Sequence, residues 1–186
     1  EALQRLREGN ARFVANNLEH DDIAEAQKRS KLADGQDPIA IILGCSDSRV
    51  PVELVFDQGL GDLFVIRVAG NIVAPSQVGS VEFAAHQFGI PLVVVMGHSD
   101  CGAIDATVEA LKHKSEGISP NITAIVDRIS PAIEPLLLDS AGLDKDKLIE
   151  RAVRANIRAS VRHLSHGSKL LEAMILENRL RVVGAE

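Results

Sequence analysis

The sequence lacks any apolar run near the ~20 residues that a helix needs to cross a membrane. Its longest apolar stretches, residues 39–43 and 91–96, have the length of strands. It also lacks a long basic run, and its net charge is −6, whereas domains that bind nucleic acid usually carry a basic stripe. These absences predict a protein that neither spans a membrane nor binds nucleic acid.

Signals of targeting, repeats and low-complexity tracts are also missing. Residues 1–7 form a charged helical pattern and not a secretory leader, which predicts a cytoplasmic location. The chain does not begin with methionine, so removal of a leader stays open as an alternative. With 186 residues, 46% hydrophobic and 25% charged, the composition predicts one ordered domain over residues 1–186.

Only two cysteines are present, Cys45 and Cys101. One interpretation is a single disulfide, which would suit a secreted protein, and another is a pair of buried free thiols. Metal binding is favoured over both, because each cysteine lies beside other metal-ligand residue types and follows an apolar stretch flanked by glycine.

Apolar β-branched runs alternate with helical patterns along the chain. The expected strands are residues 39–43, 63–66, 91–96 and 180–183, and the expected helices are residues 2–17, 22–33, 76–88, 101–112, 121–138, 144–164 and 168–178. This alternation predicts an α/β fold, with a mostly parallel sheet flanked by helices. Pro131 and Pro135 are expected to break or kink the helix that contains them.

The chain divides into an extended N-terminal helical arm, residues 1–34, and an α/β core, residues 38–186. It stops at Glu186, directly after the last expected strand, which raises the alternative that a C-terminal hairpin is missing.

Two segments carry the chemistry, Gly44-Cys-Ser-Asp-Ser-Arg49 and Gly97-His-Ser-Asp-Cys-Gly102, and each follows a buried strand. Ligands of open parallel sheets bind at the carboxyl ends of strands, so the two segments are expected to face one cleft. Zinc prefers thiolate and imidazole ligands, and Cys45, His98 and Cys101 supply three. Three protein ligands leave a fourth position open, as in catalytic sites. The start of a helix at Cys101 is expected to favour its thiolate.

Asp47 admits two interpretations. It can close the fourth metal position, or it can pair with Arg49, two residues further on. Pairing would keep the carboxylate ionised and off the metal, where it accepts a hydrogen bond without being a ligand. The simplest alternative is an ordinary surface ion pair, worth ~0–1 kcal/mol. We favour the paired, functional form because Asp47 lies so near a predicted ligand.

Both segments resemble the signature motifs of β-carbonic anhydrases. The resemblance continues through residues 56–62, 64–67, 69–71 and 79–84, and the pattern Leu-x-x-Gly-Asn-x-x-Phe at residues 6–13 is similar to the N-terminal helix of that family. It therefore covers essentially the whole chain.

This resemblance implies zinc held by Cys45, His98 and Cys101, with Asp47 and Arg49 as the catalytic pair. It implies reversible hydration of carbon dioxide to bicarbonate and a proton. It also implies a homodimer whose N-terminal helices embrace the partner, often doubled to a tetramer, with the active site at the dimer interface.

Two variants of the family differ around the site. In the first, a glutamine in a Gly-Gln-x-Pro context binds substrate, and Gln36 matches it. The other substrate-binding positions implied here are Phe64, Ala69, Phe83 and Gly102, although tyrosine is frequent at position 83 and valine at position 69.

In the second variant, a Trp–Arg–Tyr cluster binds bicarbonate and favours Asp ligation of zinc. This chain has no Trp and no Tyr; Ile42 stands at the Trp position, and only Arg67 matches. The resemblance therefore implies the open zinc site of the first variant.

In the expected mechanism, the nucleophile donates its proton to Asp47, which aims a lone pair at carbon dioxide. Gln36 of the neighbouring subunit binds the product bicarbonate. Two alternatives use the same residues. One is hydrolysis of carbonyl sulfide or carbon disulfide, which depends on the width of the pocket. The other is a non-catalytic zinc or bicarbonate-sensing protein in which Asp47 permanently closes the site.

Overall fold

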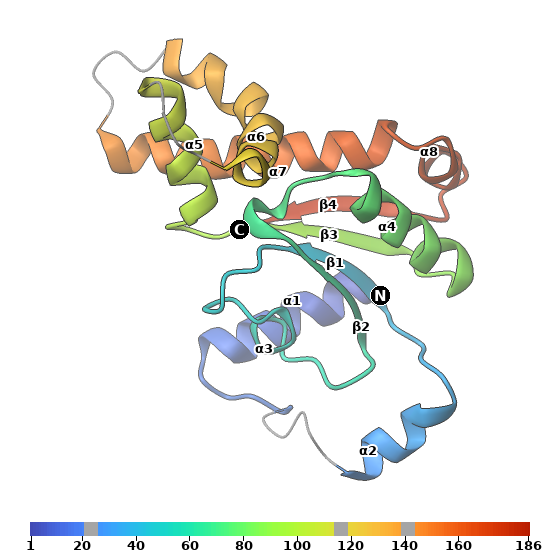
Figure 1. The fold of residues 1–186 in the computed structure, drawn as a ribbon. Helices are drawn as coiled ribbons and strands as arrows, with labels where there is room; N and C mark the ends of the chain where they lie inside the picture. Colours follow the sequence, from blue (N-terminus) through green and yellow to red (C-terminus); the bar gives the residue numbers. More distant parts are fainter. Residues whose placement is uncertain (21–25, 114–118, 139–143) are drawn as a thin grey trace.

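Four parallel strands form the centre of the protein in a computed structural model that describes residues 1–20, 26–113, 119–138 and 144–186 (Figure 1). The strands are β1 (Ala40–Gly44), β2 (Leu63–Arg67), β3 (Leu92–Met96) and β4 (Arg181–Ala185), in the order β2-β1-β3-β4. All three pairings are parallel. The predicted α/β fold with a parallel sheet is confirmed.

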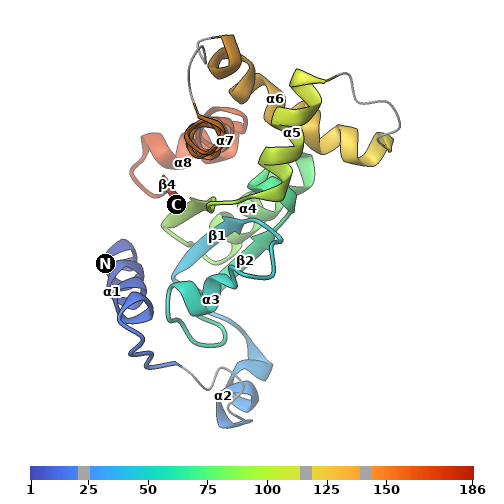
Figure 2. The same cartoon turned by 90° about the vertical axis from the view of Figure 1, so that its left-hand side faces the viewer.

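Helices cover both faces of this sheet (Figures 1 and 2). One face carries α4 (Pro75–Gln87), α5 (Gly102–Lys112), α6 (Pro120–Leu138), α7 (Lys145–His166) and α8 (Lys169–Leu176), and the other carries α1 (Ala2–Val14) and the short α3 (Val52–Val55). Alternate strand residues serve the two layers: Ile41 and Leu43 pack in the larger core, and Ile42 packs toward α1. Among the described helices, none is long and apolar enough to cross a bilayer.

Two of the expected helices differ from their predictions. Helix α6 continues through Pro131 and Pro135, so the expected break is wrong, whereas the alternative of a kink stays a prediction. Each internal proline costs about 3 kcal/mol, but Ile129 and Ile133 are completely buried on either side of Pro131, and burying such side chains returns about 1.5–3 kcal/mol each. Of the helix expected at residues 22–33, α2 (Ala26–Lys31) and the 3₁₀ turn η1 (Leu32–Asp34) are present; residues 22–25 lie outside the described residues.

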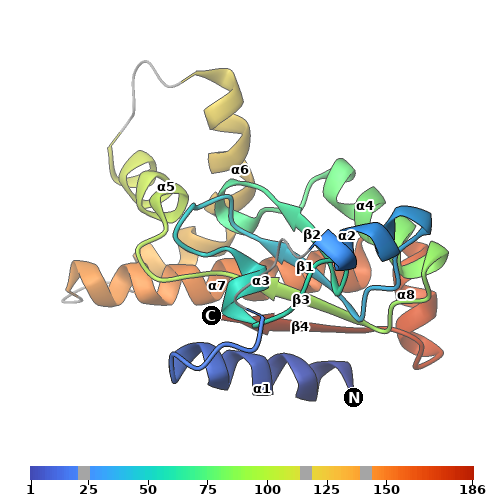
Figure 3. The ribbon, with the colours of Figure 1, turned by 90° about the horizontal axis from the view of Figure 1, so that it is seen from below.

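The predicted N-terminal arm has two parts. Helix α1 lies along its own sheet (Figure 3), with Leu6 only 1% exposed. Gly9 permits this close docking, because a Cβ there would lie 1.8 Å from the carbonyl oxygen of Phe56. Helix α2, in contrast, stands away from the core (Figures 1 and 2).

A buried carboxylate fastens the end of α1 to the core. Asp57 accepts hydrogen bonds from Arg12 Nε at 2.5 Å and from the backbone N–H groups of Glu19 and His20 at 3.1 and 2.9 Å. Burial alone would raise the pKa of Asp57, but these donors lower it to about 2. Asp57 is therefore charged at neutral pH and holds residues 12–20 against the end of α3.

Candidate metal centre

The two predicted segments leave the sheet side by side. Strands β1 and β3 are neighbours, and their last paired residues are Gly44 and Met96. The chain after β1 reaches Cys45 at once, and the chain after β3 reaches His98 and then Cys101, which is the N-cap of α5. Parallel pairing thus brings residues more than fifty positions apart to one edge of the sheet.

Three donor side chains converge at this edge. Ligand atoms of Cys45, His98 and Cys101 all lie within 4.8 Å of one another, and the three residues are buried. The two sulfur atoms are 4.0 Å apart and both thiols are free, whereas a disulfide bond measures about 2.05 Å. The disulfide interpretation is therefore wrong.

His98 is oriented as a metal ligand would be. Its Nδ1 lies 2.8 Å from the carbonyl oxygen of Ser99, which can only accept, so Nδ1 carries the proton. Nε2 is buried and has no hydrogen-bond partner within the described residues. A buried nitrogen without a hydrogen-bond partner lowers the stability of the folded protein by about 1–3 kcal/mol, and a bound metal ion would supply the missing partner. Two thiols and one imidazole nitrogen are a donor set that fits zinc.

Asp47 points toward the centre while it is held by Arg49. Its carboxylate accepts from Arg49 Nε at 2.9 Å, from Arg49 Nη2 at 2.7 Å and from the Arg49 backbone N–H at 3.0 Å. These contacts hold the pKa of Asp47 well below its usual range. One carboxylate oxygen lies 4.0 Å from His98 Nε2, so Asp47 stands beside the ligand group without belonging to it.

The two thiols differ in acidity. The pKa of Cys45 is lowered, chiefly because the Cys101 thiol donates to its sulfur, with help from the backbone at Asp47 and Gly70. The pKa of Cys101 is raised by the same pairing and by burial. The backbone N–H groups of Ile104 and Ala103 at the start of α5 do lower the pKa of Cys101, as expected, but the pairing with Cys45 and burial outweigh them.

Contacts from outside the two motifs hold the Cys45 loop. Arg67 donates from Nε to the carbonyl oxygen of Cys45 at 2.8 Å and from Nη2 to that of Asp47. The backbone N–H of Gly70 donates to Cys45 Sγ at 3.3 Å, and Asn156 of α7 donates to the Gly70 carbonyl. Sequence analysis gave Arg67 a different role and missed Asn156. The only signal was a polar residue at a buried helical position.

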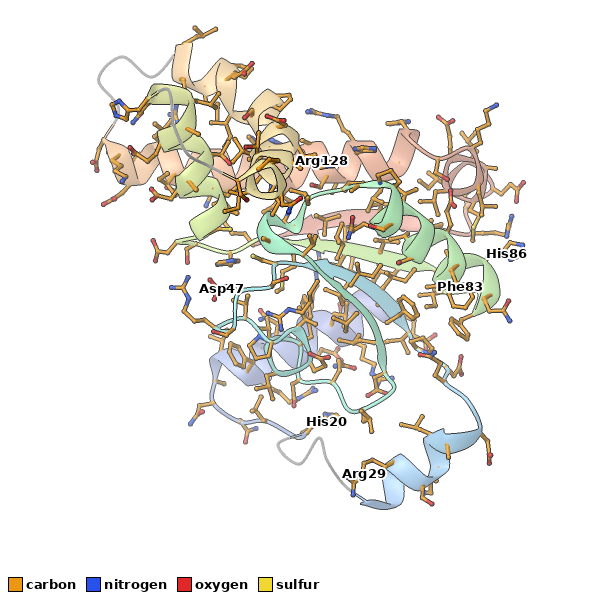
Figure 4. All side chains as sticks on the ribbon, in the orientation of Figure 1. His20, Arg29, Asp47, Phe83, His86 and Arg128 are labelled. Carbon is orange, nitrogen blue, oxygen red and sulfur yellow. The ribbon has the colours of Figure 1, made fainter. Side chains whose placement is uncertain are left out.

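The implied substrate-binding residues fall into two groups. Ala69 and Gly102 adjoin the centre, since Ala69 precedes Gly70 and Gly102 follows Cys101. Phe64 and Phe83 instead pack together with a ring separation of 6.4 Å, and Figure 4 shows Asp47 and Phe83 at opposite ends of the sheet. Gln36 is exposed and lies before β1, at the amino end of the strand whose carboxyl end leads to Cys45.

A family model described as carbonic anhydrase matches residues 40–186. Carbonic anhydrase 2 of Mycobacterium tuberculosis is 37% identical over 185 residues, which cover 98% of this chain and 85% of that protein. A carbonic anhydrase of Mycolicibacterium smegmatis is 44% identical over 146 residues, 77% of this chain and 68% of that one.

The fold is also similar to a solved structure. The β-carbonic anhydrase CcaA superposes with a TM-score of 0.76 at 28% identity, over 99% of this chain and 89% of that chain.

Proposed function

This chain belongs to the β-carbonic anhydrase family, and from that premise we propose that Cys45, His98 and Cys101 hold the zinc ion of a carbonate dehydratase. The enzyme catalyses the reversible hydration of carbon dioxide to bicarbonate and a proton. One observation carries the residue assignment: two thiols and an unpaired imidazole nitrogen converge in a buried cluster.

Zinc, when bound, would lower the pKa of water enough to generate a nucleophile near neutral pH, behaviour for which carbonic anhydrases are the standard example. Asp47 is the hydrogen-bond acceptor that orients this nucleophile, since its carboxylate faces the centre and stays ionised. Arg49 keeps Asp47 off the metal through three hydrogen bonds and is itself tied to the Asp100 carbonyl at 3.0 Å. The fourth metal position therefore remains available for catalysis.

Metal analysis together with stopped-flow assays tests this proposal. We expect about one zinc per chain and rapid hydration of carbon dioxide. Rates on carbonyl sulfide, measured with the same preparation, should be far lower, in keeping with relatives that are carbonic anhydrases. A zinc-containing protein that hydrolyses carbonyl sulfide faster than it hydrates carbon dioxide would contradict the assignment, and so would a protein that binds no zinc.

We further propose that the active form is a homodimer, or a dimer of dimers, in which Gln36 completes the partner's site. The five residues of β1 span about 16 Å, so Gln36 at its amino end is too far to reach Cys45 of its own chain. Phe83 supports a contact surface at the same end of the sheet, because it is 55% exposed and packs on Phe64 of the edge strand β2. Helix α2, which stands away from the core of its own chain, is placed where it can contact a second copy of the protein.

Mixed dimers test whether Gln36 acts in the partner's site. Gln36→Ala should lower activity about 10-fold, as expected for a lost hydrogen bond to a charged product, and Asp47→Asn should be nearly inactive. If Gln36 acts across the interface, a heterodimer of the two variants has one intact site and regains about half the wild-type rate. Co-expression with two affinity tags isolates it. A heterodimer whose rate is only the average of its parents would place Gln36 in its own chain's site, or in none.

We also assign the enzyme to a reducing compartment, the cytoplasm. Cys45 and Cys101 lie only 4.0 Å apart, so oxidation would require little movement and would remove two of three ligands. Cytoplasmic reductants prevent such bonds.

A further inference from the structure

Two polar side chains lie on the buried face of α7. Asn156 is 2% exposed and Ser160 is 5% exposed, one helical turn apart. Burying an amide costs about 1–3 kcal/mol unless it is hydrogen-bonded, and both residues are. Asn156 Nδ2 donates to the Gly70 carbonyl at 2.7 Å, and Ser160 Oγ donates to the Asn71 carbonyl at 3.1 Å. Helix α7 thus holds the 3₁₀ turn η2 (Ala69–Asn71).

The turn η2 also contacts the metal centre. Gly70 has a φ of +67° and donates its N–H to Cys45 Sγ at 3.3 Å. A Cβ on Gly70 would lie 2.8 Å from Ile129 and 3.1 Å from Ala103, so side chains of α6 and α5 pack closely against the turn on that side. Gly70 is therefore fixed between apolar packing, the thiol that it donates to and the amide of Asn156.

We propose that Asn156 is a positioning residue that sets the hydrogen bond from Gly70 to the Cys45 thiolate. This inference rests on the zinc site of the proposed function. A hydrogen bond to a thiolate is charge-assisted and withdraws charge that the sulfur would otherwise give to the metal. Asn156 touches neither substrate nor reacting atoms, so its effect passes through Gly70: it holds the carbonyl on one side of the Gly70 Cα, and the N–H on the other side donates to Cys45. Ser160 holds the next carbonyl, that of Asn71, and supplies the matched comparison, since it secures the same turn without contacting Gly70.

Cobalt-substituted protein provides a readout other than activity. Asn156→Leu keeps the size of the side chain and removes the donor. It should shift the sulfur-to-cobalt charge-transfer band and weaken cobalt binding about 10-fold in competition with a chelator, as outer contacts of metal ligands usually do. Ser160→Ala should leave the band in place and change affinity less than about 2-fold. Unchanged band and affinity in Asn156→Leu, or equal changes in both variants, would overturn the proposal.

Two further measurements keep the proposal testable if Asn156→Leu does not fold. Asn156→Ala also removes the Nδ2 donor and should shift the band in the same way. In wild-type protein loaded with an NMR-active cadmium isotope, the Gly70 amide proton should couple to cadmium through the N–H···S hydrogen bond, and absence of that coupling refutes the proposal. Failure of the wild type to bind cobalt or cadmium would instead refute the metal centre itself, so the two failures are distinguishable.

Discussion

Replacing Cys101 with serine should abolish stoichiometric zinc binding and lower the rate of carbon dioxide hydration about 10³-fold or more. Among the described residues, this cluster has three donors, and the Cys101 sulfur is one of them. It is also buried, so the cluster has no further donor to take its place. Serine is a poor zinc ligand, and the generation of a nucleophile at neutral pH depends on the metal. Metal analysis after dialysis and stopped-flow kinetics measure the two effects.

Ser99→Ala is the matched control for that variant. Ser99 lies between two predicted ligands and is exposed, and the only contact described for it is the backbone carbonyl that receives His98 Nδ1. Its side chain can therefore be removed with zinc content and rate unchanged. Because bound metal stabilises the folded state, Cys101→Ser should also melt at a lower temperature than Ser99→Ala. If Cys101→Ser retained one zinc per chain and most of its activity, Cys101 would not be a ligand.

The parallel sheet and the triad were predictable because each depends on local patterns. Short β-branched runs predicted the four strands within one or two residues at each end. The rule that ligands bind at the carboxyl ends of strands then predicted that Cys45 would meet His98 and Cys101. No knowledge of side-chain packing was needed for either step.

Features that depend on packing between distant segments were not predictable. Nothing near Asn156 in the sequence reveals that its amide meets Gly70, 86 residues earlier. The relative acidity of the two thiols was also out of reach, since it depends on which sulfur accepts the hydrogen bond from the other thiol. The continuity of α6 through its prolines is a third case, because it depends in part on the burial of Ile129 and Ile133, which offsets much of the local cost.

Replacing Asp47 with asparagine should leave zinc in place and lower kcat for hydration about 10²–10³-fold, the usual range for loss of one preorganised hydrogen-bonding group at the reacting atoms. Asparagine keeps the shape of the side chain, but it removes the negative charge that both accepts a hydrogen bond from the nucleophile and binds Arg49 through paired hydrogen bonds. Asp100→Asn is an isosteric control in the same loop region, because it keeps the backbone carbonyl that accepts from Arg49 and removes only a charge that attracts Arg49 without a hydrogen bond.

The pH dependence of the same variant gives a sharper test. Contacts from Arg49 depress the pKa of Asp47. The carboxylate is therefore charged throughout the pH range in which an aspartate ordinarily titrates, and it is protonated only at a pH well below that range. Asp47 therefore does not titrate between about pH 5 and pH 9, given an unperturbed value near ~3.9. The ratio of wild-type to Asp47→Asn rates should stay constant across that window, and any acid loss of activity common to both must come from another group. A ratio that falls toward one as the pH drops to about 5 would mean that Asp47 becomes protonated there, and Arg49 could then not be the partner that keeps it ionised.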